Sequence, residues 1–427
     1  MSIQKVAIIG ANRIPFARSN GAYSDASNID MLSAALEGLV TRFELANKDI
    51  GEVVAGTVLK HSRDLNLTRE AVLNTALAPT TPCYDLSQAC GTGLQAVFAA
   101  ANKIALGHID SGIAGGTDTT SDAPIALGDG LRKPLLRLGV AKTTKDRLSA
   151  LTSLNPKHLL AFPQNGEPRT GLSMGEHQAI TTLEWQIGRE AQDELAYASH
   201  HHLAAAYDAG FFDDLITPYK GLSRDNNLRG DTSMEKLAKL APVFGKKRPN
   251  PTMTAGNSTP LTDGASCVLL GSDRWAAANG YSPLAYLTHQ ATAAVDFVGK
   301  TGAPEGLLMA PAYAVPKMLA KAGLTLQDFD FYEIHEAFAS QVLCTLAAWE
   351  DETFCRTRLG LDKALGQIDR SKLNVNGSSL AAGHPFAATG GRIIATAAKL
   401  LAQKGSGRAL VSICAAGGQG VVCILER

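Results

Sequence analysis

The sequence lacks an excess of charge of either sign, because its 40 basic residues are balanced by 40 acidic ones. A chain without net positive charge gives no reason to expect nucleic acid as a partner. It also has no apolar run long enough to cross a bilayer. The first ten residues lead directly into a predicted strand, so we expect neither a signal nor a transit peptide. The 427 residues suffice for two or three globular domains.

The cysteines lack a pairing pattern. There are seven, none in a Cys-x-x-Cys motif, at positions 83, 90, 267, 344, 355, 414 and 423. An odd, scattered set argues against a disulfide framework and against a zinc site, and we expect a reducing, cytoplasmic location. The adjacent histidines 200 to 202 do not suggest a metal, because neighbours on a helix point roughly 100° apart and cannot chelate one ion together.

A dinucleotide fingerprint is also missing. The segment 10–16 follows a buried strand at residues 6–9, where such a fingerprint would stand, but it holds one glycine instead of three. We predict an ordinary loop there and no Rossmann site.

What is present is an alternation of strands and helices, which predicts an α/β fold. The order of elements in residues 317–418 repeats that in residues 36–116, so we predict an internal duplication. The intervening region is richer in charge, proline and broken helices. We divide the chain into a first half at 1–120 together with 251–280, an inserted loop domain at 121–250, and a second half at 281–427, after a linker near 279–283.

Cys90 stands in the stretch Leu-Ser-Gln-Ala-Cys-Gly-Thr-Gly-Leu at 86–94, between a predicted strand and a predicted helix. A thiol at this place faces the unpaired N–H groups and the positive end of the helix, which favours the nucleophilic thiolate. A small buried cysteine in a tight turn explains this stretch equally well.

The duplication bears on that choice. The position that matches Cys90 in the second half carries Gly383-His384-Pro385. If the two helix N-termini converge, His384 can take the proton of Cys90.

Cys414 follows a strand in a glycine-rich segment, where a second thiol can act as acid or base and the N–H of Ala416 can hold an oxyanion. His335 reads by itself as a buried structural histidine.

Taken in order, these segments resemble the thiolase family across essentially the whole chain: Ser87–Gly91, His335-Glu-Ala-Phe338, Gly383-His-Pro385 and Cys414–Gly420, with 254–265 as a further similar stretch. The resemblance implies a thiolase-like fold of two duplicated α/β/α halves with an inserted loop domain. It is strongest to the β subunits of fatty-acid oxidation complexes, which carry His-Glu-Ala-Phe where other thiolases carry Asn-Glu-Ala-Phe. Gly91-Thr-Gly-Leu94 instead resembles short-chain thiolases.

The resemblance implies a 3-ketoacyl-CoA thiolase. Cys90, activated by His384, attacks the thioester of a 3-oxoacyl-CoA, and Cys414 protonates the acetyl-CoA carbanion that leaves. His384 and His335 stabilise the enolate oxygen, and the N–H groups of Cys90 and Ala416 hold the oxyanion. No metal or other cofactor is implied. The expected CoA-binding residues, by position, are Met174, Arg229, Thr259 and Phe338, although Arg229 reads almost equally well as a solvated surface residue.

Three other functions stay open at this point. The chain can be an acetoacetyl-CoA thiolase, a condensing synthase, or an idle lipid carrier on the same fold; Cys414 disfavours the synthase, and the presence of Cys90, His384 and Cys414 disfavours the carrier. The resemblance also implies a homo-oligomer, either a dimer or a dimer of dimers. Candidate partners are a hydratase/dehydrogenase α subunit of an oxidation complex and a membrane surface.

The segment 131–163 is basic and interleaved with leucines. Such a stretch can dock to an acidic partner or to anionic lipid, and a helical lid over the acyl site explains it equally well. If the inserted domain covers that site, we expect Leu159, Leu160, Phe162 and Leu172 to line an acyl tunnel. We expect broad activity on medium and long 3-oxoacyl chains.

Overall fold

Two sets of strands build the central sheet. The computed structural model describes residues 3–164 and 166–427. The first set comprises β1 (Val6–Arg13), β3 (Val53–Ala55), β4 (Cys83–Asp85), β5 (Ser111–Asp118) and β8 (Thr262–Ser272). The second comprises β9 (Ala285–Ala294), β10 (Phe331–Ile334), β11 (Arg408–Ala415) and β12 (Gln419–Glu426). A short strand, β2 (Ala17–Arg18), pairs with β8.

The strand order is symmetric about the centre of the sheet. It runs β10-β11-β12-β9-β1-β8-β5-β3-β4, and the halves meet where β1 and β9 pair antiparallel, with Ile8 opposite Ala285. Two antiparallel pairs come first on each side of the seam: β1 with β8 and β8 with β5 in the first half, and β9 with β12 and β12 with β11 in the second. A parallel pair follows, β5 with β3 or β11 with β10, and the first half adds β4, which is parallel to β3. The predicted duplication is therefore visible in the topology.

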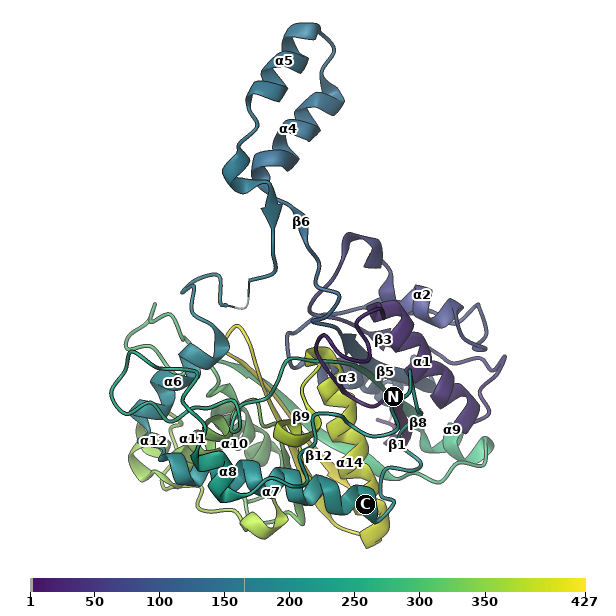
Figure 1. The fold of residues 1–427 in the computed structure, drawn as a ribbon. Helices are drawn as coiled ribbons and strands as arrows, with labels where there is room; N and C mark the ends of the chain where they lie inside the picture. The colour runs from purple at the N-terminus through teal and green to yellow at the C-terminus, as the bar shows by residue number, and fades with distance from the viewer. Residues whose placement is uncertain (1–2, 165) are drawn as a thin grey trace.

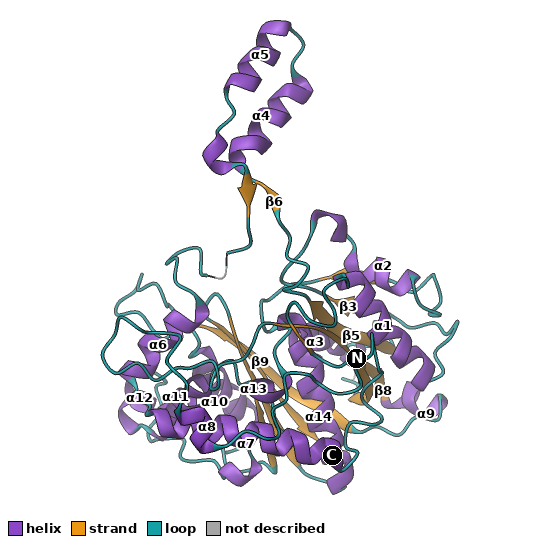
Figure 2. Ribbon diagram, viewed as in Figure 1, coloured by secondary structure: helices purple, strands orange, loops and turns teal. Residues whose placement is uncertain are grey.

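Helices pack on both faces of the sheet, and two of them lie between its two halves (Figure 2). In the two halves they are α1 (Asn28–Arg42), α2 (Leu67–Leu73), α3 (Thr92–Ala105), α9 (Asp273–Ala278), α10 (Ala310–Ala322), α11 (Ala339–Glu350), α12 (Glu352–Thr357), α13 (Ser379–Ala382) and α14 (Thr389–Lys404). α3 and α14 contact each other and strands of both halves, whereas α1 packs on β1, β5 and β8, and α10 packs on β9, β11 and β12. The layers are therefore outer helices, the strands of one half, the central helices α3 and α14, the strands of the other half, and outer helices again. This arrangement confirms the predicted fold class.

Two strands are longer than the sequence predicts. β1 continues through Gly10 to Arg13, so the loop predicted at 10–16 is wrong for its first residues. Gly10 lies at a bulge in the pairing with β8, and a Cβ there would lie 1.8 Å from the Phe43 ring. β5 continues through Gly115 and Gly116 to Asp118. These glycines permit close approach of neighbouring backbone and do not end the strand.

The helix α1 begins with a capping box. Its cap is Ser27, whose hydroxyl accepts a hydrogen bond from the N–H of Asp30, and the carboxylate of Asp30 accepts one from the N–H of Ser27. Asn28, the first residue of the helix, donates from its side chain to the carbonyl of Leu59. The reciprocal capping box explains the choice of Ser27, because it satisfies two N–H groups at once.

The inserted region has two parts. α6 (Met174–Glu184), α7 (Arg189–Asp208) and α8 (Met234–Ala238) belong to the body, where α6 and α7 pack on α11. α4 (Asp129–Val140) and α5 (Thr144–Thr152) form a hairpin that stands away from the body on the paired strands β6 (Ala126–Leu127) and β7 (Leu160–Ala161) (Figure 1). The hairpin therefore does not form the lid considered above.

The position of the hairpin also corrects the predicted acyl tunnel. Leu159, Leu160 and Phe162 are 38%, 56% and 62% exposed and line no enclosed tunnel, because they lie at the base of the projecting hairpin. Within the described residues, no helix is both long and apolar enough to cross a membrane.

Candidate active site

Cys90 lies in a strained turn between β4 and α3. The preceding residue, Ala89, has a φ of 46°, a left-handed conformation that costs a non-glycine residue about 1–2 kcal/mol. Thr92 holds the turn: its hydroxyl accepts a hydrogen bond from the N–H of Gln88 at 2.8 Å and donates to the carbonyl of Ala89 at 2.7 Å. The side chain of Cys90 stays partly accessible, as a nucleophile requires.

The prediction that this position favours a thiolate at rest is wrong. Burial raises the pKa of the Cys90 thiol to about 12. Hydrogen bonds from the backbone N–H groups of Ala416 and of Cys90 itself act in the opposite direction but do not offset burial. Cys90 therefore rests as a neutral thiol and needs a base. The two N–H groups assigned to the oxyanion from the sequence are those that contact this sulfur.

The two central helices bring the halves together at their N-termini. An added Cβ on Gly93 of α3 would lie 2.4 Å from the carbonyl oxygen of Ala387 and 3.3 Å from the N–H nitrogen of Gly390 in α14. The convergence anticipated from the duplication is therefore present. The positions do not match residue for residue, however. Cys90 precedes its helix by two residues and His384 by five, because a 3₁₀ turn at Phe386–Ala388 is added in the second half.

His384 and His335 form a buried pair. Their ring centroids are 4.1 Å apart. The Nδ1 of His384 is 2.6 Å from the hydroxyl of Thr389, and the Nδ1 of His335 is 2.7 Å from the hydroxyl of Ser379. Both Nε2 atoms are buried and, among the described residues, lack a hydrogen-bond partner. Each ring is thus anchored on one side and has its other nitrogen free for chemistry.

Burial keeps both histidines neutral. It lowers the pKa of His384 to about 3, with a further contribution from the charge of Arg392. It lowers the pKa of His335 well below the ordinary value, with contributions from His384 and Arg392. A neutral imidazole can accept the proton of a neutral thiol, so Cys90 and His384 rest in complementary protonation states.

Cys414 lies one residue before the end of β11, inside an apolar cluster. Burial raises the pKa of its thiol well above the ordinary value, and Cys90 is close enough to raise it further. The two thiols therefore share one site. The cluster around Cys414 comprises Met174, Ala179, Phe244, Met253, Phe297, Leu307, Leu308, Ala337 and Phe338. Met253 belongs to the first half and the other residues to the inserted region and the second half, and together they supply an apolar wall beside Cys414.

The sequence reasoning missed two carboxylates at the site. Asp118, at the end of β5, accepts hydrogen bonds from the N–H of Leu59 at 2.8 Å and from the N–H of Ala387 at 2.9 Å, and so joins the first half to the segment that follows His384. Burial raises the pKa of Asp118 to about 6. Its place in the strand-end motif Gly-Gly-Thr-Asp was the available signal.

The second missed carboxylate is Glu167 of the inserted region. It is 7% exposed and accepts a hydrogen bond from the N–H of Gly417 at 2.6 Å, next to Ala416. It therefore holds the loop that carries Ala416, whose N–H is predicted to hold the oxyanion. No local pattern around 167 indicated this contact, which spans 250 residues of sequence.

The structure brings together three of the four residues expected to bind CoA. Met174 and Phe338 belong to the apolar cluster, and Thr259 donates a hydrogen bond from its hydroxyl to the carbonyl of Ala337, also in that cluster. Arg229 is exposed, and its guanidinium donates to the carbonyls of Asn226 and Leu228. It lies outside the cluster, as a solvated arginine would.

The three adjacent histidines face different partners. His200 accepts from the N–H of Arg229, His201 contacts the carbonyl of Thr232, and His202 contacts the carbonyl of Asn374. They do not converge on one point, as their helical spacing predicts.

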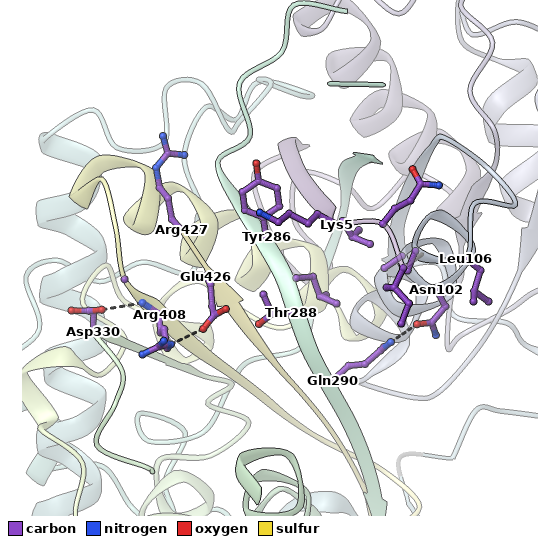
Figure 3. A pocket seen from close by; sticks show the side chains of 17 residues that line it. Lys5, Asn102, Leu106, Tyr286, Thr288, Gln290, Asp330, Arg408, Glu426 and Arg427 are labelled. Atoms are coloured by element: carbon purple, nitrogen blue, oxygen red, sulfur yellow. Dashed lines mark hydrogen bonds and ion pairs between the residues drawn. The ribbon is translucent and has the colours of Figure 1, made fainter. Parts of the chain in front are cut away.

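A cavity of about 930 Å³ lies elsewhere, beside both termini (Figure 3). Arg408 in its wall pairs with Glu426 at 2.5 Å and donates its N–H to Asp330. Neither the reactive cysteines nor the two site histidines line it, and its charges largely compensate one another. We therefore place the chemistry at Cys90.

Comparison with known proteins identifies the family of the chain. The family model described as "Thiolase, N-terminal domain" matches residues 6–274, and "Thiolase, C-terminal domain" matches residues 281–427. The chain belongs to the thiolase family. The two matches meet close to the predicted linker at 279–283.

Individual relatives are similar over their whole length. The chain is 39% identical to a 3-ketoacyl-CoA thiolase of Shewanella pealeana, covering 99% of this chain and 97% of that one. It is also 39% identical to a 3-ketoacyl-CoA thiolase of Pectobacterium atrosepticum, covering 99% and 96%. Among solved structures, the acetyl-CoA acetyltransferase of Bacillus anthracis is 30% identical with a TM-score of 0.80, covering 100% and 99%. Human mitochondrial 3-ketoacyl-CoA thiolase is 28% identical with the same TM-score, covering 99% of both chains.

Proposed function

We propose that the protein is a 3-ketoacyl-CoA thiolase that cleaves 3-oxoacyl-CoA with CoA during fatty-acid β-oxidation. The observation that supports the proposal is the convergence of the N-termini of α3 and α14. The mutual influence of the Cys90 and Cys414 thiols and the contact of the His335 and His384 rings also support it. The names of the 39%-identical relatives support the same substrate class.

In the first half-reaction, Nε2 of His384 takes the proton of Cys90. The sulfur attacks the 3-keto carbon, and the N–H groups of Cys90 and Ala416 stabilise the oxyanion. The bond between C2 and C3 then breaks, and its electrons form the enolate of acetyl-CoA. In this scheme the Nε2 of His335 donates to the enolate oxygen, and Cys414 protonates C2. Each preorganised donor of this kind is typically worth about 3 kcal/mol.

This scheme corrects the point of attack expected from the sequence. Attack of Cys90 at the thioester carbon would transfer the whole 3-oxoacyl group and would release CoA. Only attack at the 3-keto carbon, followed by cleavage between C2 and C3, releases acetyl-CoA and leaves a shortened acyl group on the sulfur.

The second half-reaction restores both cysteines. The thiol of a fresh CoA gives its proton to the Cys414 thiolate and attacks the acyl carbon. Cys90 leaves as a thiolate and recovers its proton from His384. The proton balance closes with these residues alone, so we propose that no metal or other cofactor takes part. Because both thiols must stay reduced, we also propose a reducing compartment such as the cytoplasm.

The test is a thiolysis assay with purified protein. With CoA present, 3-oxoacyl-CoAs of four, eight and sixteen carbons should all yield acetyl-CoA, and kcat/KM should rise with chain length if the apolar cluster holds the acyl group. Failure to cleave any of them would refute the proposal.

An acetyl-CoA acetyltransferase is the second candidate. The structural likeness to the Bacillus anthracis enzyme and to human 3-ketoacyl-CoA thiolase has the same TM-score, so the fold favours neither. We prefer longer chains because His335 matches the oxidation-complex type. Activity on the four-carbon substrate alone would select the acetyltransferase.

We further propose that the α4–α5 hairpin docks the enzyme to an anionic membrane surface. It projects from the body (Figure 1), and Leu136, Leu148 and Leu151 on it are 60%, 63% and 50% exposed. Exposed leucines among basic residues suit a lipid surface better than a fully charged partner. A hydratase/dehydrogenase α subunit is the other occupant to be tested.

Charge reversal tests this docking. Replacing Arg132, Lys133 and Arg137 with Glu should abolish co-sedimentation with anionic vesicles, whereas reversal of Lys317 and Lys321 on the body should not. Unchanged sedimentation would refute the membrane proposal, and lost binding to an α subunit alone would assign the hairpin to that partner.

We propose a homo-oligomer, either a dimer or a dimer of dimers. β4 ends the strand order, and Tyr84 on it is 37% exposed. Such an edge is a natural place for a second copy to pair. Light scattering after gel filtration measures the mass directly, and a monomer of 44.8 kDa would refute this.

A further inference from the structure

A hydrogen-bonded network of buried polar groups lies beside the Nδ1 of His335. The hydroxyl of Ser379 is 2.7 Å from the Nδ1 of His335. Nη2 of Arg392, on α14, donates to that same hydroxyl at 2.9 Å and to the hydroxyl of Ser378 at 3.2 Å. Arg392 is 3% exposed, and Ser379 and His335 are fully buried. The mechanism described above uses none of the groups behind the histidine.

The direction of these hydrogen bonds follows from the chemistry of the groups. Arginine only donates, so the oxygen of Ser379 must accept from Arg392. The serine proton then needs an acceptor of its own, and Nδ1 of His335 is the one within reach. A nitrogen that accepts carries no proton. The proton of neutral His335 is therefore on Nε2, the atom that is buried without a partner in the described part of the chain.

The acidic residues around this network explain how a buried arginine is tolerated. Glu333 on β10 is fully buried beside Arg392, and Glu336 lies nearby. Glu336 is already engaged, because it accepts hydrogen bonds from Ser199, Asn374 and the N–H of Leu380. Glu333 has no such partners among the described residues. Burial raises the pKa of Glu333 to about 8, and the neighbouring charge of Arg392 acts against that rise.

We propose that Arg392 and Ser379 are positioning residues that fix His335 as the Nε2–H tautomer, so that it donates a hydrogen bond to the enolate oxygen. The inference rests on the proposed thiolase reaction. An asparagine side chain at this position presents its N–H₂ group without tautomer control. A histidine can present either a donor or an acceptor, and the serine and arginine behind it remove that ambiguity.

The first test separates Ser379 from its neighbour. Ser379→Ala removes the hydrogen bond to His335, whereas Ser378→Ala removes a contact with the same arginine and leaves His335 untouched. We expect Ser379→Ala to lower kcat for thiolysis about 10- to 100-fold with little change in KM, as outer-shell changes to a functional histidine commonly do. Ser378→Ala should stay within about threefold. Equal losses in both variants would overturn the proposal.

A second readout isolates the step. Exchange of labelled CoA into acetyl-CoA requires acylation of Cys90 but no enolate. Ser379→Ala should leave this exchange within about threefold of the wild type while thiolysis falls. A parallel fall of both activities would show a general structural role and would overturn the assignment. A wild-type protein with neither activity would instead refute the thiolase function.

The tautomer itself can be observed without catalysis. In ¹⁵N-histidine-labelled protein, the ring signals of His335, identified by their absence in His335→Gln, should show a protonated Nε2 and an unprotonated Nδ1. In Ser379→Ala this pattern should be lost or mixed. A protonated Nδ1 in the wild type would overturn the proposal even if the Ser379 variant fails to fold.

Discussion

The two central helices begin alike, yet their first residues do different work. α3 and α14 both start with Thr-Gly, at Thr92 and Thr389. The hydroxyl of Thr92 bonds only backbone groups and so shapes the turn that presents Cys90. The hydroxyl of Thr389 bonds the ring of His384 and so orients a side chain. Duplication supplies two equivalent anchors, and each half uses its anchor for a different part of the reaction.

The interiors behind the two helices differ as well. α3 buries apolar side chains such as Leu94, Val97 and Phe98 along its length. α14 buries Arg392 at the position that corresponds to Gln95 of α3. The first half thus presents a nucleophile from a rigid backbone turn. The second half holds histidines whose orientation depends on other buried polar groups, and we expect it to be more sensitive to substitution and to pH.

The largest expected effect is on the nucleophile of the first half. Cys90→Ser should lower thiolysis by about 1,000-fold or more, because a serine hydroxyl is a far weaker nucleophile than a thiol at neutral pH. Incubation with acetyl-CoA should acetylate the Cys90 peptide in the wild type, as read by mass spectrometry. Cys414→Ala should abolish thiolysis yet keep this acetylation.

Cys83→Ser is the matched control, since Cys83 is another partly buried free thiol, and it should retain full activity. Acetyl label on Cys414 instead of Cys90 would reverse the roles assigned to the two halves.

The sequence was sufficient for the fold class, which its alternation of strands and helices predicts. It also predicts the reactive residues, because these stand in short motifs at strand ends. It did not reveal β9, whose pairing with β1 joins the halves, since that pairing is set by contacts nearly 280 residues apart. It also missed Glu167 and Asp118. Glu167 contacts a backbone N–H group 250 residues further along the chain, which leaves no local pattern. The strand-end motif that holds Asp118 was a local signal, but its contact with Ala387 was not visible in the sequence.

The prediction that Cys90 favours a thiolate at rest was wrong for a related reason. The helix terminus is a local feature that the sequence displays, whereas the desolvation that outweighs it depends on how both halves close around the thiol. The prediction of an acyl tunnel was wrong for the same kind of reason. An apolar run such as 159–162 has the same sequence pattern whether it lines a cavity or supports a projecting hairpin.

A smaller effect compares the two threonines directly. Thr389→Val keeps the shape of the side chain but frees the ring of His384, and we expect kcat to fall about 10- to 100-fold while the melting temperature changes little. Thr92→Val removes hydrogen bonds from a turn, and we expect a loss of about 1 kcal/mol of stability with a smaller loss of kcat. Kinetics and thermal unfolding of both variants check this. If the two variants share one profile, the anchors are equivalent after all.

The smallest expected effect concerns acid. The pKa of His384 in the folded protein is about 3, below its ordinary value of 6.5, so between these values the unfolded chain binds a proton that the folded site excludes. Stability contributed by this group is therefore full above about pH 6.5 and declines as the pH falls. At pH 5 the decline amounts to about 2 kcal/mol, or about 2 °C in the melting temperature of a chain this long.

His384→Asn should remove this part of the acid sensitivity between pH 7 and pH 5, whereas Cys90→Ser, which alters the first half of the same site, should retain it. Equal shifts in the two variants would show that the acid sensitivity does not come from His384, and the contrast between a rigid turn and a pH-dependent His384 would then be wrong.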